Sequence, residues 1–135
     1  MGSDYIFRSP SVAAFATSIG KALAESRRQS ALRLFIQIND NLLASDSIRK
    51  VEMCREEPPL TGQAGYDALI AGLVEYYFIG SRLTLPDWVN MEDRSLPSPW
   101  YFEEFPFDKE DIQISTPECF AHRNVFIRES ELMSV

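Results

Sequence analysis

The sequence predicts a mainly α, compact helical domain around one central apolar helix, with an irregular proline- and aromatic-rich C-terminal half and at most a minor strand pairing. Three observations support this fold class. Residues 66–79 are almost wholly apolar, residues 10–55 carry apolar side chains at helical spacing, and prolines break the chain after residue 80 into short pieces. A chain of 135 residues suits a single domain that can bury a core.

The central segment, YDALIAGLVEYYFIG, has only Asp67 and Glu75 as charged residues. A helix that is apolar on most sides must be covered on most sides. The segment is shorter than the roughly 20 residues that span a membrane. We therefore expect a buried helix over 63–80, with Asp67 in its first turn and Gly80 as a left-handed C-terminal cap. A strand over 69–79 is the alternative, because short apolar runs fit both structures.

Three helices are expected before the central one, and apolar spacing places them at about 10–26, 28–44 and 46–55. Ser9 and Pro10 are typical of a helix N-cap and first turn. Ser45 and Asp46 are expected to cap the third helix, with Ile48, Val51 and either Met53 or Cys54 turned towards the core. The whole domain is then expected to comprise a flexible tail, the N-terminal helices, a proline-rich loop, and the central helix with its C-terminal wrap, at 1–8, 9–55, 56–62 and 63–135.

The C-terminal half is expected to consist of short elements between prolines. A helical turn at 86–89 would seat Trp88, and Thr116 would cap a helix that begins at Pro117 and ends near His122. The remaining elements are expected to be a helix, a short strand and a final helical turn, at 108–114, 125–127 and 130–133.

Charge is unevenly distributed along the chain, whose net charge is −7. Residues 1–60 carry eight Lys and Arg against seven Asp and Glu, whereas residues 61–135 carry five against thirteen. An acidic half argues against nonspecific nucleic-acid binding, which needs clustered cations. It suits a partner protein with a basic surface. The two cysteines form no CxxC pair and no secretory signal or membrane span is recognisable, so a cytoplasmic location with reduced thiols is expected.

Catalytic, cofactor and metal motifs are not recognisable in the sequence. Cys119 and His122 have the spacing of one helical face, which fits a nucleophilic pair but also a helix end in which His122 caps carbonyls. The densest acidic cluster fits a solvated surface, partner docking, or acid–base and metal chemistry. That cluster comprises Glu103, Glu104, Asp108, Glu110 and Asp111.

The aromatic run WYFEEFPF allows two interpretations. Its rings either pack over the central helix, together with Trp88, or form an exposed patch edged by acids, the composition of a protein-binding hot spot. The candidate partner-binding residues are Trp100, Tyr101, Phe102, Glu103, Glu104 and Asp108. Arg123 is a candidate for a buried ion pair with Glu75, because its guanidinium can satisfy two carboxylate oxygens.

Several segments together resemble a family of small uncharacterised actinobacterial proteins, often found beside nucleotidyltransferase-type toxins. The similarity covers about residues 56–132 and includes a proline-bearing linker, an aromatic-Asp-Ala-Leu helix with a glutamate, a Leu-Pro-x-Trp turn, a Pro-Trp-aromatic segment and a final Pro-x-x-Phe-x-x-Arg-x-x-Phe-Ile motif. The matching residues are Tyr66, Asp67, Ala68, Leu69, Glu75, Pro86, Trp88, Pro99, Trp100, Phe102, Pro117, Phe120, Arg123, Phe126, Ile127 and Leu132.

The resemblance implies an antitoxin-like or regulatory role with a cognate toxin as partner. This chain has Tyr66 where the family usually has Trp, and it lacks a helix-turn-helix segment. We therefore expect a non-enzymatic protein-interaction module. The alternatives are a DNA-binding regulator that uses the basic N-terminal helices, and a small enzyme that uses the acidic cluster. A homodimer through the first two helices is a further alternative, because Phe15, Ile19, Phe35 and Ile36 offer more apolar surface than a small core needs.

Overall fold

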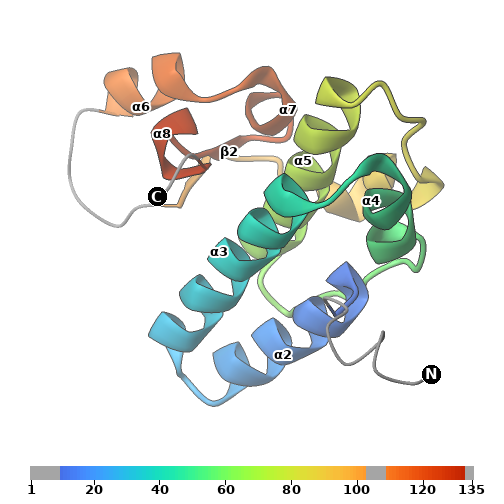
Figure 1. The fold of residues 1–135 in the computed structure, drawn as a ribbon. Coiled ribbons are helices and arrows are strands. Elements are labelled where there is room, and N and C mark those ends of the chain that lie inside the picture. Colours follow the sequence, from blue (N-terminus) through green and yellow to red (C-terminus); the bar gives the residue numbers. More distant parts are fainter. Residues whose placement is uncertain (1–9, 103–108, 133–135) are drawn as a thin grey trace.

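The computed structural model describes residues 10–102 and 109–132, whose helices surround one central helix (Figure 1). The helices are α2 (Val12–Ala24), α3 (Arg28–Ala44), α4 (Ser47–Cys54), α5 (Ala64–Gly80), α6 (Lys109–Ser115), α7 (Glu118–Ala121) and α8 (Glu129–Leu132), with 3-10 turns η1 (Asp87–Asn90) and η2 (Glu92–Arg94). Strands β1 (Trp100–Tyr101) and β2 (Val125–Phe126) pair in parallel. The predicted mainly helical fold with a minor strand pairing is confirmed. The tail expected at 1–8 lies outside the described residues.

Helix α5 is the buried centre of the fold. All its residues from Gly65 to Val74 are buried, and Tyr77 and Phe78 extend this surface by one turn. It is covered by α3 and α7 and by the η1 and η2 turns, which come from both sides of it in sequence. A segment with apolar side chains all round can be hidden only by several neighbours. The predicted central helix is confirmed, and the strand alternative is wrong.

Helices α2 and α3 lie side by side and form the N-terminal part of the core (Figure 1). The side chains of Phe15, Ile19 and Phe35 are buried within the single chain, and Ile36 is half-buried. The apolar surplus expected on these helices is therefore not present. Ser11, and not Ser9, is the N-cap of α2, because its hydroxyl accepts the amide hydrogen of Ala14.

Helix α4 is rotated from the orientation that its sequence suggested. Asp46 caps it as predicted, at 2.8 Å from the amide nitrogen of Arg49. However, Ile48 and Val51 are 77% and 36% exposed, so the prediction that they face the core is wrong. The buried face carries Met53 and Cys54, which the sequence also suggested, and the aliphatic part of the Lys50 side chain, whose ammonium group donates to the Ser45 carbonyl. A lysine can bury its stem when its charged end still finds an acceptor.

Two predicted caps are also placed differently. Gly80 is the last residue of α5, and the left-handed position falls on Arg82, with φ of 58°. There the amide of Leu83 donates to the Phe78 carbonyl at 2.8 Å and closes the helix end. Thr116 does not cap α7. Its hydroxyl donates to the Ile112 carbonyl and accepts the Ile127 amide hydrogen, so it joins α6 to the segment after β2.

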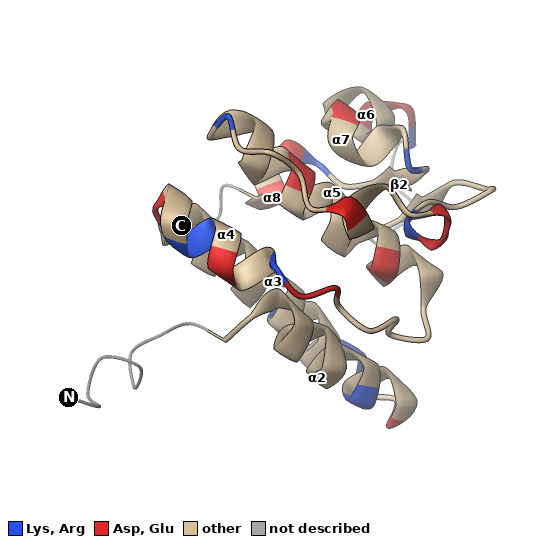
Figure 2. Cartoon of the chain, turned by 90° about the vertical axis from the view of Figure 1, so that its right-hand side faces the viewer, with Lys and Arg blue, Asp and Glu red and all other residues tan. Residues whose placement is uncertain are grey.

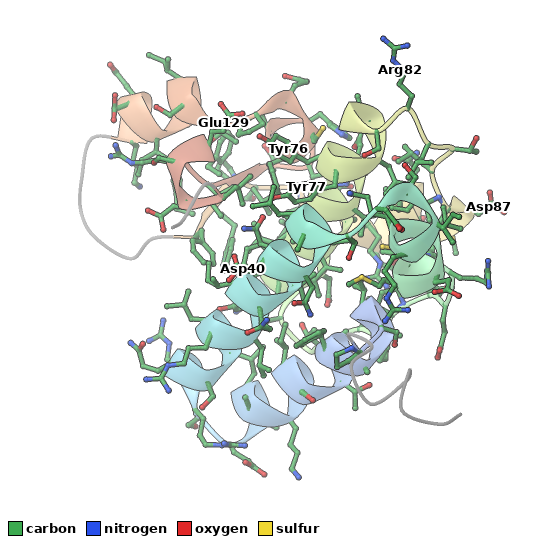
Figure 3. The ribbon with its side chains drawn as sticks, in the orientation of Figure 1. Asp40, Tyr76, Tyr77, Arg82, Asp87 and Glu129 are labelled. Atoms are coloured by element: carbon green, nitrogen blue, oxygen red, sulfur yellow. The ribbon has the colours of Figure 1, made fainter. Side chains whose placement is uncertain are left out.

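Hydrogen bonds of polar side chains hold the C-terminal elements against α3 and α5. Asn39 of α3 is fully buried; it accepts from the Tyr77 hydroxyl at 2.6 Å and donates to the Leu132 carbonyl at 3.0 Å. The neighbouring Tyr76 hydroxyl donates to Glu129 at 2.7 Å. Figure 3 shows both tyrosines on α5, with Glu129 beside Tyr76. Burial raises the pKa of Tyr77 to about 12, so its hydroxyl stays a donor.

Among the described helices, none is long and apolar enough to cross a membrane.

Candidate functional site

Glu75 and Arg123 form a buried ion pair beneath the C-terminal wrap. A guanidinium nitrogen of Arg123 lies 2.5 Å from the Glu75 carboxylate, and the arginine side chain is 2% exposed. The same guanidinium donates to the carbonyls of Cys119 and Val89 and to the Asn90 side chain. The pair predicted from the sequence is therefore present. The Arg123 guanidinium therefore links α7, α5 and η1, which is a structural role.

The lone histidine adjoins this pair. His122 Nε2 lies 3.0 Å from the same Glu75 oxygen and 2.8 Å from the Arg123 guanidinium. Burial raises the pKa of Glu75, but hydrogen bonds from Arg123 and His122 outweigh burial and hold that pKa below its ordinary value. Glu75 is thus ionised at neutral pH and acts as the counterion of Arg123.

A nucleophilic cysteine is not supported by this geometry. Among the described residues no hydrogen bond joins the Cys119 thiol to His122, whose Nε2 faces Glu75 instead. Burial, together with the nearby Glu75 charge, raises the pKa of Cys119, and burial raises that of Cys54 to about 12. A thiol must ionise to act as a nucleophile, so the raised pKa values argue against that role for both cysteines.

The described aromatic residues of the run pack inwards. Trp100 lies 5.8 Å from the Tyr66 ring and directly over Gly65, where an added Cβ would come within 2.3 Å of the indole. Phe102 contacts Phe35, and Tyr101 stacks on Phe126. All three remain half-buried. Trp88 is buried and seated by η1, as the sequence predicted.

The acidic cluster predicted at 103–111 is only partly visible. Glu103, Glu104 and Asp108 lie outside the described residues, so the partner-binding and chemical roles expected for them stay predictions. Glu110 and Asp111 are exposed on α6, and Asp111 pairs with Arg128 at 2.8 Å. In the parts of the chain that the structure describes, no group of acidic, cysteine and histidine side chains has the arrangement of a metal site.

The basic residues of the N-terminal helices do not share one face. Arg27, Arg28 and Arg33 lie at the start of α3, whereas the three cations of α4 follow the end of α3. This 17-residue helix is about 25 Å long, so the two groups lie towards its opposite ends. Lys50 is also buried, and Arg27 and Arg49 are paired with Glu25 and Glu52. The single basic face required for DNA binding is not formed.

A different acidic surface is assembled by the fold, and we call it the acidic face. It consists of exposed carboxylates from two segments that are far apart in sequence: Glu56, Glu57, Asp87, Glu92 and Asp93. None of these five side chains has a hydrogen bond or ion pair within the described residues. Figure 2 looks onto the side of the molecule that carries α4 and colours the acidic positions red.

Two buried hydrogen bonds hold the segments of the acidic face together. The Trp88 indole donates to the Cys54 carbonyl at 3.0 Å, and Arg94 donates to the Pro58 carbonyl at 2.5 Å. The Arg94 guanidinium lies 5.1 Å from the Trp88 ring centre and is 1% exposed. The sequence predicts a seated Trp88, but no local pattern in it predicts that Arg94 pairs with Pro58.

A hollow of about 420 Å³ opens beside the acidic face. Its apolar lining comes from Val51, Phe78, Leu85, Pro86 and Trp88, and its charged rim from Arg55, Glu57 and Asp87. Figure 3 shows Arg82 and Asp87 on the far side of the molecule from Glu129. Apolar pockets with charged rims are typical of protein-binding surfaces.

Comparison with protein-family models, with curated proteins and with solved structures gave no match to this chain.

Proposed function

We propose that the protein is a non-enzymatic interaction module that docks onto a basic and apolar surface of another protein. The hollow beside the acidic face is the single observation that carries this proposal. Its floor offers Phe78, Leu85 and Trp88 to an apolar side chain, while Glu57 and Asp87 at the rim lack partners within the described part of the chain. Charges with no intramolecular partner can meet opposite charges on a partner and accelerate the encounter.

The chemistry of the described side chains supports docking over catalysis. Both thiols are held protonated by burial, and Glu75 is engaged as the counterion of Arg123. The resemblance to small actinobacterial proteins narrows the proposal. It suggests a nucleotidyltransferase-type toxin as the partner and an antitoxin-like or regulatory role for this protein. Co-purification with the product of the adjacent gene is the direct way to identify the partner.

Charge reversal on the acidic face tests the proposal. Asp87→Lys and Glu57→Lys place cations where a basic partner would dock, so each should weaken binding roughly tenfold at low salt. Glu118→Lys makes the same charge change on α7, away from the hollow, and should bind as the native chain does. Binding is measured by titrating the co-purified partner at low and high ionic strength, where screening should weaken the native complex.

Two results would contradict the proposal. One is a native chain that captures no protein at low salt. The other is equal loss of binding in all three variants, which would mean that overall charge matters and the hollow does not.

A further inference from the structure

The hollow beside the acidic face suits an apolar group that carries a cation next to it. Its floor is apolar, and its rim has two carboxylates, Glu57 and Asp87, against one guanidinium, Arg55. None of these three side chains has a hydrogen bond or ion pair within the described residues. An occupant should therefore cover the floor with apolar side chains and bring one positive charge to the rim.

Three segments of the chain lie outside the described residues, and only one of them combines apolar side chains with a cation. Residues 1–9 read MGSDYIFRS, in which Arg8 directly follows a run of tyrosine, isoleucine and phenylalanine. Residues 103–108 carry three acids and no cation, and residues 133–135 carry no charge. The rim carboxylates would repel the first of these two and attract neither, so the sequence before α2 is the occupant that the charges favour.

The position of α2 brings this segment close to the hollow. Helix α2 packs against α4, which lines the hollow, and in Figures 1 and 2 the start of α2 lies nearer α4 than its end does. The loop that carries Glu57 also runs against α2, since a Cβ added at Gly20 would lie 3.3 Å from the Thr61 carbonyl oxygen. Residues 5–9 span up to about 17 Å when extended, whereas α4 is about 12 Å long. The segment is therefore long enough to run beside α4 to the hollow.

We infer that residues 5–8 dock into the hollow of their own chain and compete there with the partner. This inference rests on the proposed function, since it supplies a regulation of the same site. Ile6 and Phe7 cover the apolar floor, and Arg8 meets the rim carboxylates. A segment held by a short linker acts at an effective concentration on the order of 1 mM, so weak contacts suffice to keep it bound for much of the time. A partner must displace it, which lowers the partner's apparent affinity.

Nuclear Overhauser spectra of the full chain test the docking without any partner. The Phe7 ring protons should give cross-peaks to the methyl groups of Leu85 and Val51, both of which line the hollow. In Phe7→Asp these methyl resonances should shift, because the ring no longer lies against them. Ser3→Asp is the matched control, since it adds the same carboxylate outside the apolar run, and it should leave the resonances in place.

Two further samples identify the occupant. Arg8→Glu should weaken the cross-peaks, and Arg8→Glu combined with Asp87→Lys should restore them, because the second change returns opposite charges to the segment and the rim. A mixture of isotope-labelled and unlabelled chains should show no cross-peaks between chains. Cross-peaks between chains would mean that a second copy supplies the segment, and would overturn the inference.

Partner binding separates failure of this inference from failure of the proposed function. Phe7→Asp should bind the co-purified partner roughly fivefold more tightly than the native chain, because a site that is free about one-fifth of the time shows about fivefold lower affinity. Absence of the cross-peaks, or equal affinity of Phe7→Asp and the native chain, overturns the inference and leaves the proposed function in place. Cross-peaks in a chain that binds no partner would support the docking and contradict the proposed function.

Discussion

Glu75 neutralises an arginine that has almost no access to water. Replacing it with Gln keeps the shape but leaves the Arg123 charge without a counterion, which should cost about 2–4 kcal/mol of unfolding free energy. The measurement is urea denaturation at pH 7. Glu118→Gln, an exposed acid on α7, is the control and should change stability by less than about 0.5 kcal/mol.

The same pair predicts a pH dependence with a defined sign. The folded-state pKa of Glu75 lies below its ordinary value of 4.5. Its stabilisation is therefore complete above pH 4.5 and is lost as the pH falls through the folded-state value. The difference in stability between the native chain and Glu75→Gln should shrink over this window. An unchanged difference down to the lowest pH at which the protein folds would contradict the assignment.

Asn39 is the second residue whose environment leads to a prediction. Asn39→Ala leaves the Tyr77 hydroxyl and the Leu132 carbonyl without partners in a dry site, and should destabilise the fold by about 2–3 kcal/mol. Because it also releases α8, amide exchange should accelerate first in residues 129–132. Asn41→Ala removes only a surface bond to Gln37 and should have little effect on either measurement.

At the scale of elements, close packing of α7 on α5 depends on a residue without a side chain. A Cβ at Gly72 would come within 2.6 Å of the Phe120 ring and 3.3 Å of the Cys119 carbonyl oxygen. Gly72→Ala should therefore cost about 1–3 kcal/mol in thermal denaturation, more than the helix propensity it gains. Gly80→Ala meets nothing within 4 Å and should be neutral or stabilising. Equal effects of the two changes would refute this account.

The sequence predicts most accurately those helices whose apolar residues follow one clear pattern. The second helix, predicted at 28–44, is α3 at Arg28–Ala44, and the apolar central helix is equally plain. In contrast, α4 has apolar residues on two sides, and the side that faces the core is the one on which the Lys50 ammonium group reaches the Ser45 carbonyl. The left-handed residue after α5 is Arg82, and the helix end is closed by a hydrogen bond from the Leu83 amide to the Phe78 carbonyl, which the position of a glycine does not predict.

At the scale of the whole molecule, the candidate surfaces could be predicted only in part. An acidic character of residues 61–135 follows from composition. The acidic face, however, combines Glu56 and Glu57 with residues 87–93, and these two segments are joined by hydrogen bonds such as that from Arg94 to the Pro58 carbonyl. A contact between residues so far apart in sequence cannot be predicted from the spacing of neighbouring residues. The Glu75–Arg123 pair was predictable because a charge inside an apolar helix needs an opposite charge.

The hydrogen bond from Asn39 to Leu132 and the ion pair of Glu75 with Arg123 can form only after the C-terminal residues have been synthesised. A ribosome completes the apolar helix well before it adds residues 118–132, which provide Phe120, Val125 and Ile127 as its cover. Until then the most apolar segment of the chain is not fully covered by its native packing partners, and contacts between distant residues form slowly. A newly made chain should therefore spend its most aggregation-prone interval during synthesis, when chaperones can still reach it.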